Sequence, residues 1–206
     1  NVDIEAQGTY LYACSPTTEV IAVSVRGDNG EILLSWAAYE DSVFPAAEYS
    51  KAIAGAKIFA HNVFFEYCVH NYNLANRFDV PFRPDWLDWD CTQAELRTFA
   101  LPAKLGDGAK ALGLPEDKAS NLAMLRLSKP RSVFFDEGIV WWPVVKELED
   151  YCNQDTLVSW RIHKRLGDLP GAVSAYQRGI ALAPSYSSGF QWYGELLFYE
   201  MGGRTQ

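Results

Sequence analysis

The sequence predicts an α/β domain in which a mixed β-sheet is flanked by helices, followed by a small helical extension. β-branched and apolar runs gather in the first sixty residues, and from about residue 92 long helical stretches follow, broken by Pro102, Pro115 and Pro130. Strands followed by helices indicate a sheet covered by helices. With 206 residues, 49% of them hydrophobic, the chain can fill one full-sized core.

Strands are expected near the N-terminus. The runs "EVIAVSVRG" (19–27) and "EILLSWAA" (31–38) are separated by "DNG" and predict a hairpin with a tight turn. The segment "NVDIE" (1–5) is expected on an adjacent strand. A further short buried strand is expected within "KIFAHN" (57–62).

Helices are expected over 45–56 and 63–75, where the composition changes to helix formers and apolar residues at helical spacing. The later predicted helices are "TQAELRTFA" (92–100), "AKLGDGAKALGL" (103–114), "EDKASNLAMLRL" (116–127) and "WPVVKELEDYCNQDTLVSWRIHKRL" (142–166). The candidate linker "GDLPG" (167–171) divides a main domain, 1–166, from a C-terminal helical extension, 167–206.

Composition excludes several classes of protein. The 18 basic and 26 acidic residues give a net charge of −8, which argues against a surface that attracts phosphate backbone everywhere. The four cysteines form no CxxC pair, so a zinc knuckle is not indicated and a reducing cytosolic compartment is favoured. No run approaches the roughly twenty apolar residues of a membrane span, so no membrane partner is expected.

Five residues are candidates for chemistry. Asp3 and Glu5 alternate on a predicted strand, so both project to one side, where a hard divalent cation would relieve their repulsion. Glu66 follows a strand and lies one turn into a helix otherwise rich in apolar residues. Tyr151 and Asp155 are four residues apart and share a helical face. Taken singly, each of these residues could also belong to a solvated surface.

Their order along the chain is more specific. The series "DIE", "HNxxFE" and "YCxxD" resembles the three motifs of the DnaQ-like 3′–5′ exonucleases, and the intervening text at 8–25 and 89–131 is similar as well. The resemblance covers residues 1–166. It is closest to the tyrosine-containing branch that proofreads for family A DNA polymerases of phages, because position 150 is Asp where the other branch has His.

The resemblance implies an RNase H-like fold with two Mg²⁺ or Mn²⁺ ions, held by Asp3, Glu5, Glu66 and Asp155. Tyr151 would orient the attacking water, and Asn62 would contact the terminal nucleotide. Phe65, beside the proposed ligand, is a candidate for stacking on a base. Two positions depart from the family pattern: Glu66 stands where aspartate is usual, and Ala6 where threonine is frequent.

The implied substrate is a single-stranded or frayed DNA 3′ end, and the implied partners are a DNA polymerase domain or replication proteins, in the cytoplasm of a bacterium or phage-infected host. An independent exonuclease acting on RNA is an alternative that the same motifs support. A catalytically weak protein-interaction module is another, since the spacing of Ala172, Tyr176, Gly179 and Pro184 resembles parts of tetratricopeptide repeats. A lone copy of such a repeat could not bury its own apolar face, so a helical pair packed on the main domain is the other interpretation of this extension.

Overall fold

The computed structural model describes residues 1–7, 12–15, 18–39, 42–115 and 141–167. The fold is mixed α/β, as predicted. The chain divides into two compact units, of which the first comprises Asn1–Asp90 with Asp117–Leu157 and the second Cys91–Glu116 with Val158–Gln206.

Three predictions concern residues outside this description. They are the helix over 116–127, the linker over 167–171 beyond its first residue, and the C-terminal extension with its repeat-like spacing. The proposed division of the chain after residue 166 therefore stays a prediction.

The N-terminal residues form an antiparallel sheet, as predicted. β1 (Val2–Gln7), β2 (Glu19–Arg26) and β3 (Ile32–Ala37) pair in the order β1-β2-β3. The turn between β2 and β3 contains Gly30 with φ of 84°, a left-handed conformation that glycine adopts without steric cost. Apart from Glu19, every residue of β2 is buried, so both faces of this central strand are covered.

A second, parallel sheet pairs β4 (Ile58–Ala60) with β5 (Trp89–Cys91). β4 confirms the short strand expected there, whereas β5 was not predicted, because its sequence "WDC" has a charged residue at its centre and is not an apolar run. β1 contacts β4, so the two sheets adjoin. Strands of both orientations are thus present, but they belong to two sheets and not to the single mixed sheet that the sequence predicted.

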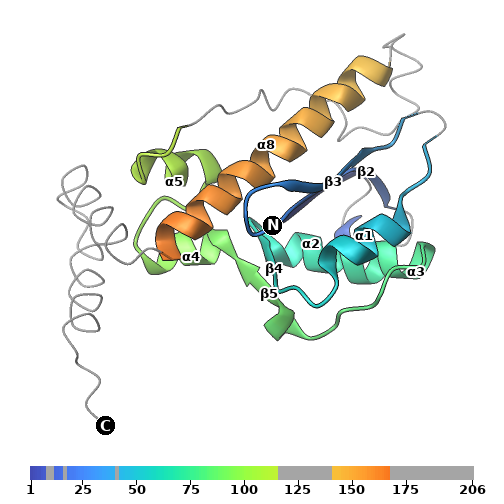
Figure 1. The fold of residues 1–206 in the computed structure, drawn as a ribbon, viewed down its shortest axis with the longest axis horizontal. Coiled ribbons are helices and arrows are strands. Elements are labelled where there is room, and N and C mark those ends of the chain that lie inside the picture. Colours follow the sequence, from blue (N-terminus) through green and yellow to red (C-terminus); the bar gives the residue numbers. More distant parts are fainter. Residues whose placement is uncertain (8–11, 16–17, 40–41, 116–140, 168–206) are drawn as a thin grey trace. The chain divides into compact units, whose positions relative to one another are not determined.

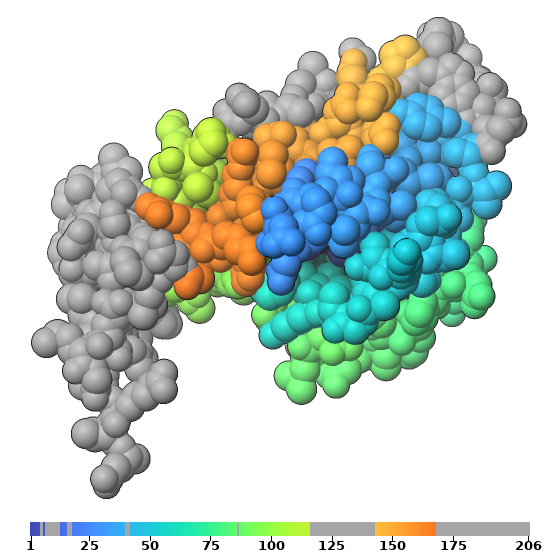
Figure 2. All heavy atoms as spheres, in the orientation of Figure 1, coloured from blue at the N-terminus to red at the C-terminus, as the bar shows by residue number. Residues whose placement is uncertain are grey.

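Helices cover both faces of the three-stranded sheet (Figure 1). α1 (Ala46–Ile53) and α2 (Val63–Val69) lie on one side, and the first part of α8 (Trp141–Gly167) lies on the other. In the space-filling view, atoms of the strands lie directly against this helix (Figure 2). Their shared buried cluster comprises Ile21, Ala22, Ala37, Val144, Val145, Leu148, Tyr151 and Cys152.

The helix predicted over 63–75 is present in an irregular form. After α2 the chain makes a π-helical turn, η2 (His70–Leu74), and continues into α3 (Ala75–Arg77). The turn buries polar side chains, among them Asn73, whose Nδ2 donates to the carbonyl oxygen of Thr18 at 2.7 Å. Such a wide turn departs from helical periodicity, so periodicity alone did not predict it.

The second unit is helical in its described part. α4 (Thr92–Thr98) and α5 (Leu105–Ala111) confirm two predicted helices and pack with the end of α8. A Cβ on Gly108 would lie 2.6 Å from Cδ1 of Leu96, so glycine permits this close packing. Among the described residues, no helix has both the length and the apolar character needed to cross a membrane. The buried cluster of this unit comprises Leu96, Leu101, Ala109, Leu112, Val158, Ile162 and Leu166.

Candidate active site

Asp3 lies near the start of β1, on the face of the sheet that α8 covers. Its backbone pairs with Ser24 of β2, and directly opposed residues of antiparallel strands project to the same face. The hydroxyl of Ser24 donates to Oδ1 of Asn153 at 2.8 Å and lies 2.9 Å from Oγ1 of Thr156. Both partners belong to α8, so Asp3 is directed toward that helix.

Asp155 of α8 acts directly on Asp3. The Cys152 thiol donates to the backbone oxygen of Asp3 at 3.3 Å, which places this turn of α8 against β1. Asp155 follows about one turn later and is half-buried. Burial and the charge of Asp155 together raise the pKa of Asp3 to about 7, while the Cys152 thiol acts in the opposite direction. The first and last predicted acids therefore lie close enough for the charge of Asp155 to act on Asp3.

This pair has the character of a cation site. Oδ2 of Asp3 is buried and accepts no hydrogen bond from the described residues. Two neighbouring carboxylates repel each other, and either a proton or a cation relieves that repulsion. Carboxylate oxygens are the preferred ligands of Mg²⁺ and similar hard divalent ions. The chemistry of Asp3 and Asp155 therefore fits a divalent cation.

Glu5 lies on β1 two residues after Asp3, and its backbone pairs with Ala22. The pairing of β1 with β2 shifts between Glu5 and Ala6, an irregularity of the kind that re-aims side chains at sheet edges and sites. The side chain of Glu5 lies outside the described part of the structure. Its role as a ligand therefore stays a prediction.

Glu66 lies on α2 and is only 3% exposed. Burial raises the pKa of Tyr49, Arg83 lowers it, and the charge of Glu66 raises it further, so the Glu66 carboxylate acts on this phenol. α2 itself contacts β1. Among the described side chains, no three carboxylate, imidazole or thiol groups surround a common metal position. The charge of Asp155 therefore acts on Asp3, whereas the charge of Glu66 acts on Tyr49.

Tyr151 lies one turn before Asp155 on α8, as its spacing predicts. It is 7% exposed and belongs to the buried cluster that joins α8 to Ile21 and Ala22. Packing therefore restricts the ring to a position beside the turn that carries Asp155.

The two predicted substrate contacts lie at the start of α2. Asn62 directly precedes the helix and is exposed, and its side chain makes no capping hydrogen bond. Phe65 is half-buried, whereas the neighbouring Phe64 is 66% exposed. The exposed aromatic face at this position therefore belongs more to Phe64 than to Phe65, a difference that the sequence did not indicate.

Sequence reasoning missed the residues that hold α8 against the sheet. Cys152 and Thr156 are each 1% exposed, and Asn153 accepts a hydrogen bond from Nη2 of Arg26 at 3.2 Å through its backbone oxygen. Small polar side chains at core-facing positions of an amphipathic helix require partners across the interface. Polar residues at core-facing positions of the predicted helix were therefore the sequence signal that could have indicated these contacts.

Comparisons with models of protein families, with curated proteins and with solved structures found no match to this chain.

Proposed function

We propose that residues 1–166 form an RNase H-like 3′–5′ exonuclease domain of the DnaQ-like type, which removes nucleotides from DNA 3′ ends during proofreading. The observation that supports this proposal is the interaction of Asp155 with the buried Asp3, because these two residues are the outermost acids of three ordered motifs. The adjoining sheets at β1 and β4 support the fold, because joining them yields the mixed sheet that the resemblance implies.

In this proposal Asp3 and Asp155 hold a divalent cation, with Glu5 and Glu66 as the further ligands. Bound Mg²⁺ or Mn²⁺ would supply an activated water and stabilise charge on the departing 3′ oxygen. A ligand carboxylate must lose its proton before it binds a cation. Because the pKa of Asp3 is about 7, loading the site near neutral pH releases a proton from part of the population.

The other side chains have positioning roles. The hydroxyl of Tyr151 would donate a hydrogen bond that orients the attacking water. The exposed amide of Asn62 would contact the terminal nucleotide. Phe65, together with Phe64, offers aromatic surface for stacking, which contributes roughly 1–3 kcal/mol per base.

The test is hydrolysis of a 5′-labelled single strand in Mg²⁺. We expect stepwise shortening from the 3′ end that stops in EDTA and falls about 100-fold or more in Asp155→Asn, since removing a metal ligand costs at least as much as removing its supporting partners. Asp150→Asn is the matched control, because Asp150 is an exposed acid of the same helix and pairs with Lys146 at the surface. Full activity in Asp155→Asn would contradict the proposal.

The same assay decides the alternatives. DNA and RNA strands of identical sequence, compared at equal concentration, separate the proofreading activity from an exoribonuclease. Absence of cleavage of both strands by the wild-type protein in Mg²⁺ and Mn²⁺ would favour the interaction module.

A further inference from the structure

The described part of the second unit has a charge opposite to that of the whole chain. Residues 91–115 and 158–167 contain six lysines and arginines but only two acids, whereas the chain as a whole has a net charge of −8. The two acids are Glu95 and Asp107. These residues therefore have a net positive charge, whereas the rest of the chain is net acidic.

Much of this charge lies on one flank of α8. Arg161, Lys164 and Arg165 are three and four residues apart, so they are neighbours on the helix surface. On the other flank of the buried stripe, Nδ1 of His163 lies 2.9 Å from Oε1 of Glu95 in α4. The helix thus presents a histidine–glutamate hydrogen bond toward α4 and a row of cations on its opposite side.

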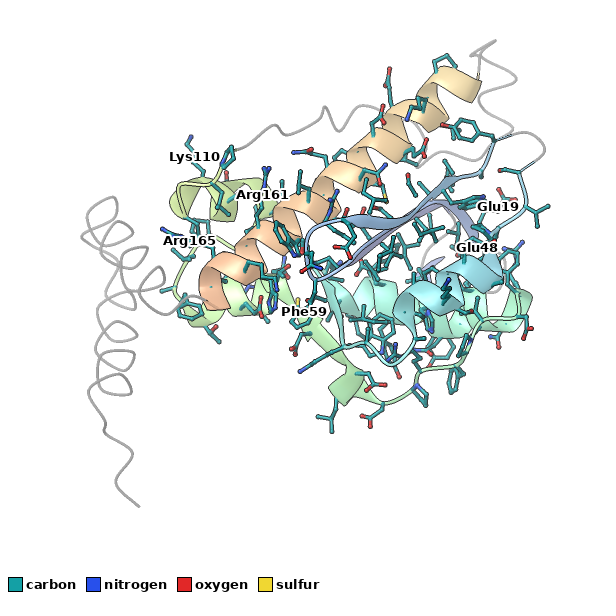
Figure 3. All side chains as sticks on the ribbon, in the orientation of Figure 1. Glu19, Glu48, Phe59, Lys110, Arg161 and Arg165 are labelled. Carbon is teal, nitrogen blue, oxygen red and sulfur yellow. The ribbon has the colours of Figure 1, made fainter. Side chains whose placement is uncertain are left out.

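α5 adds a fourth cation. Its residues pack with the end of α8 in one buried cluster, and Figure 3 shows Lys110, Arg161 and Arg165 around these two helices. Lys110 and Lys164 are exposed, and the two arginines are half-buried. In the described part of the chain, the ion pairs include neither Lys110 nor Arg161. We call Lys110, Arg161, Lys164 and Arg165 the basic face.

We infer that the basic face binds the phosphate backbone of a single-stranded nucleic acid without reading its bases. This inference rests on the proposed function, which implies that the bound strand is DNA, and it adds a surface that holds the strand. Guanidinium groups match phosphate geometry and remain charged at any working pH. The rest of the chain has a net negative charge, which repels a polyanion, so attraction requires a local surface such as this basic face.

Binding by this face has a predictable dependence on salt. Each phosphate that a cation neutralises on a single strand contributes about −0.7 to the slope of log K against log salt concentration. Four such contacts predict a slope of about −3. Base composition should change the affinity little, because phosphate contacts carry no direct sequence information.

The experiment measures the fluorescence anisotropy of a labelled single-stranded oligonucleotide in EDTA, so that binding is observed without hydrolysis. We expect Lys110→Glu with Arg161→Glu to weaken binding about tenfold or more and to reduce the magnitude of the slope by about 1.4. The matched control is Lys51→Glu with Lys57→Glu, which changes the net charge equally on the first unit. Thermal unfolding verifies that both double variants remain folded.

Three outcomes would overturn the inference: equal losses in the two double variants, a binding slope near zero, or equally tight binding of polyglutamate. Binding in EDTA tests this inference, and cleavage in Mg²⁺ tests the proposed function, so the two failures are distinguishable. A wild-type protein that binds through the basic face but cleaves nothing would refute only the exonuclease.

Discussion

At the scale of single residues, Glu149 of α8 and Asp3 of β1 illustrate how surrounding groups determine the pKa of an acid. Glu149 accepts hydrogen bonds from Ser35 at 2.8 Å, Tyr39 at 2.7 Å and Lys146 at 3.3 Å. Burial alone would raise the pKa of Glu149, but these donors together hold it below its ordinary value. Asp3 faces another carboxylate instead, and its pKa is about 7. The acid without strong donors is the better candidate for a cation ligand.

His70 is a buried titratable residue with a structural role. Its Nε2 lies 2.9 Å from the carbonyl oxygen of Pro81, which can only accept, so Nε2 carries the proton. Nδ1 then accepts from the hydroxyl of Tyr49 at 3.0 Å. Burial lowers the pKa of His70 to about 4, with Pro81 acting in the opposite direction and Arg83 adding to the decrease. The ring is therefore neutral over most of the pH range.

This neutrality predicts acid sensitivity. An unfolded histidine takes up a proton near pH 6.5 and folded His70 only near pH 4, so its contribution to stability is complete above pH 6.5 and is lost as the pH falls toward 4. The loss is about 3 kcal/mol. We expect urea unfolding to show a steeper decline over this range in the wild type than in His70→Gln. If the free energy of unfolding fell equally with pH in both proteins, His70 would not be the cause of the acid sensitivity.

At the scale of elements, α8 combines three functions that the sequence could only list separately. Its apolar stripe supplies Leu148 to the core against the sheet, and its polar residues bond to Ser24 of β2. The same turns present Tyr151 and Asp155. The position of the candidate site therefore depends on how α8 docks on β2.

The contribution of the contacts between the Ser24 hydroxyl and α8 can be tested by removing that hydroxyl. Ser24→Ala deprives Asn153 and Thr156 of a partner within a buried interface, and we expect the free energy of unfolding to fall by about 1–3 kcal/mol. Ser42→Ala is the control, because Ser42 is exposed and its hydroxyl donates to backbone oxygens of Ala37 and Tyr39 and not to α8, so its loss should cost about 0.5 kcal/mol. Equal effects in denaturant titrations would mean that the buried network contributes little to docking.

At the scale of the whole molecule, acidic and basic residues are distributed unevenly between the two units of the chain. The first unit contains the acidic pair, and the described part of the second unit is positively charged. Under the proposed function, a site for divalent cations requires acids and a surface for phosphate requires bases, and different stretches of the chain would supply them. The net charge of −8 is an average, and the described residues of the second unit depart from it.

A cation that binds only the folded protein should stabilise it. We expect Mg²⁺ or Mn²⁺ at a hundred times its dissociation constant to add about 2.7 kcal/mol of stability, which raises the melting temperature by several degrees. Asp155→Asn should lose this response, whereas Asp150→Asn should keep it. Differential scanning fluorimetry measures the shifts, with Na⁺ at matched ionic strength as the control. An unchanged response in Asp155→Asn would place the cation elsewhere.

The amino-acid sequence by itself determined the α/β class, the β2–β3 hairpin, β1 and the long helix α8, because each depends on local periodicity or turn chemistry. It also determined the order of the three acidic motifs. The strand β5 is not an apolar run, and the π-helical turn η2 departs from helical periodicity, so both became visible only in the structure.

Only the tertiary structure decided that the charge of Asp155 acts on Asp3, and that the charge of Glu66 acts on Tyr49. It also decided that Cys152 bonds to the backbone of Asp3. These relations depend on which faces of distant elements pack together, and packing between distant elements leaves no periodic pattern along a single chain.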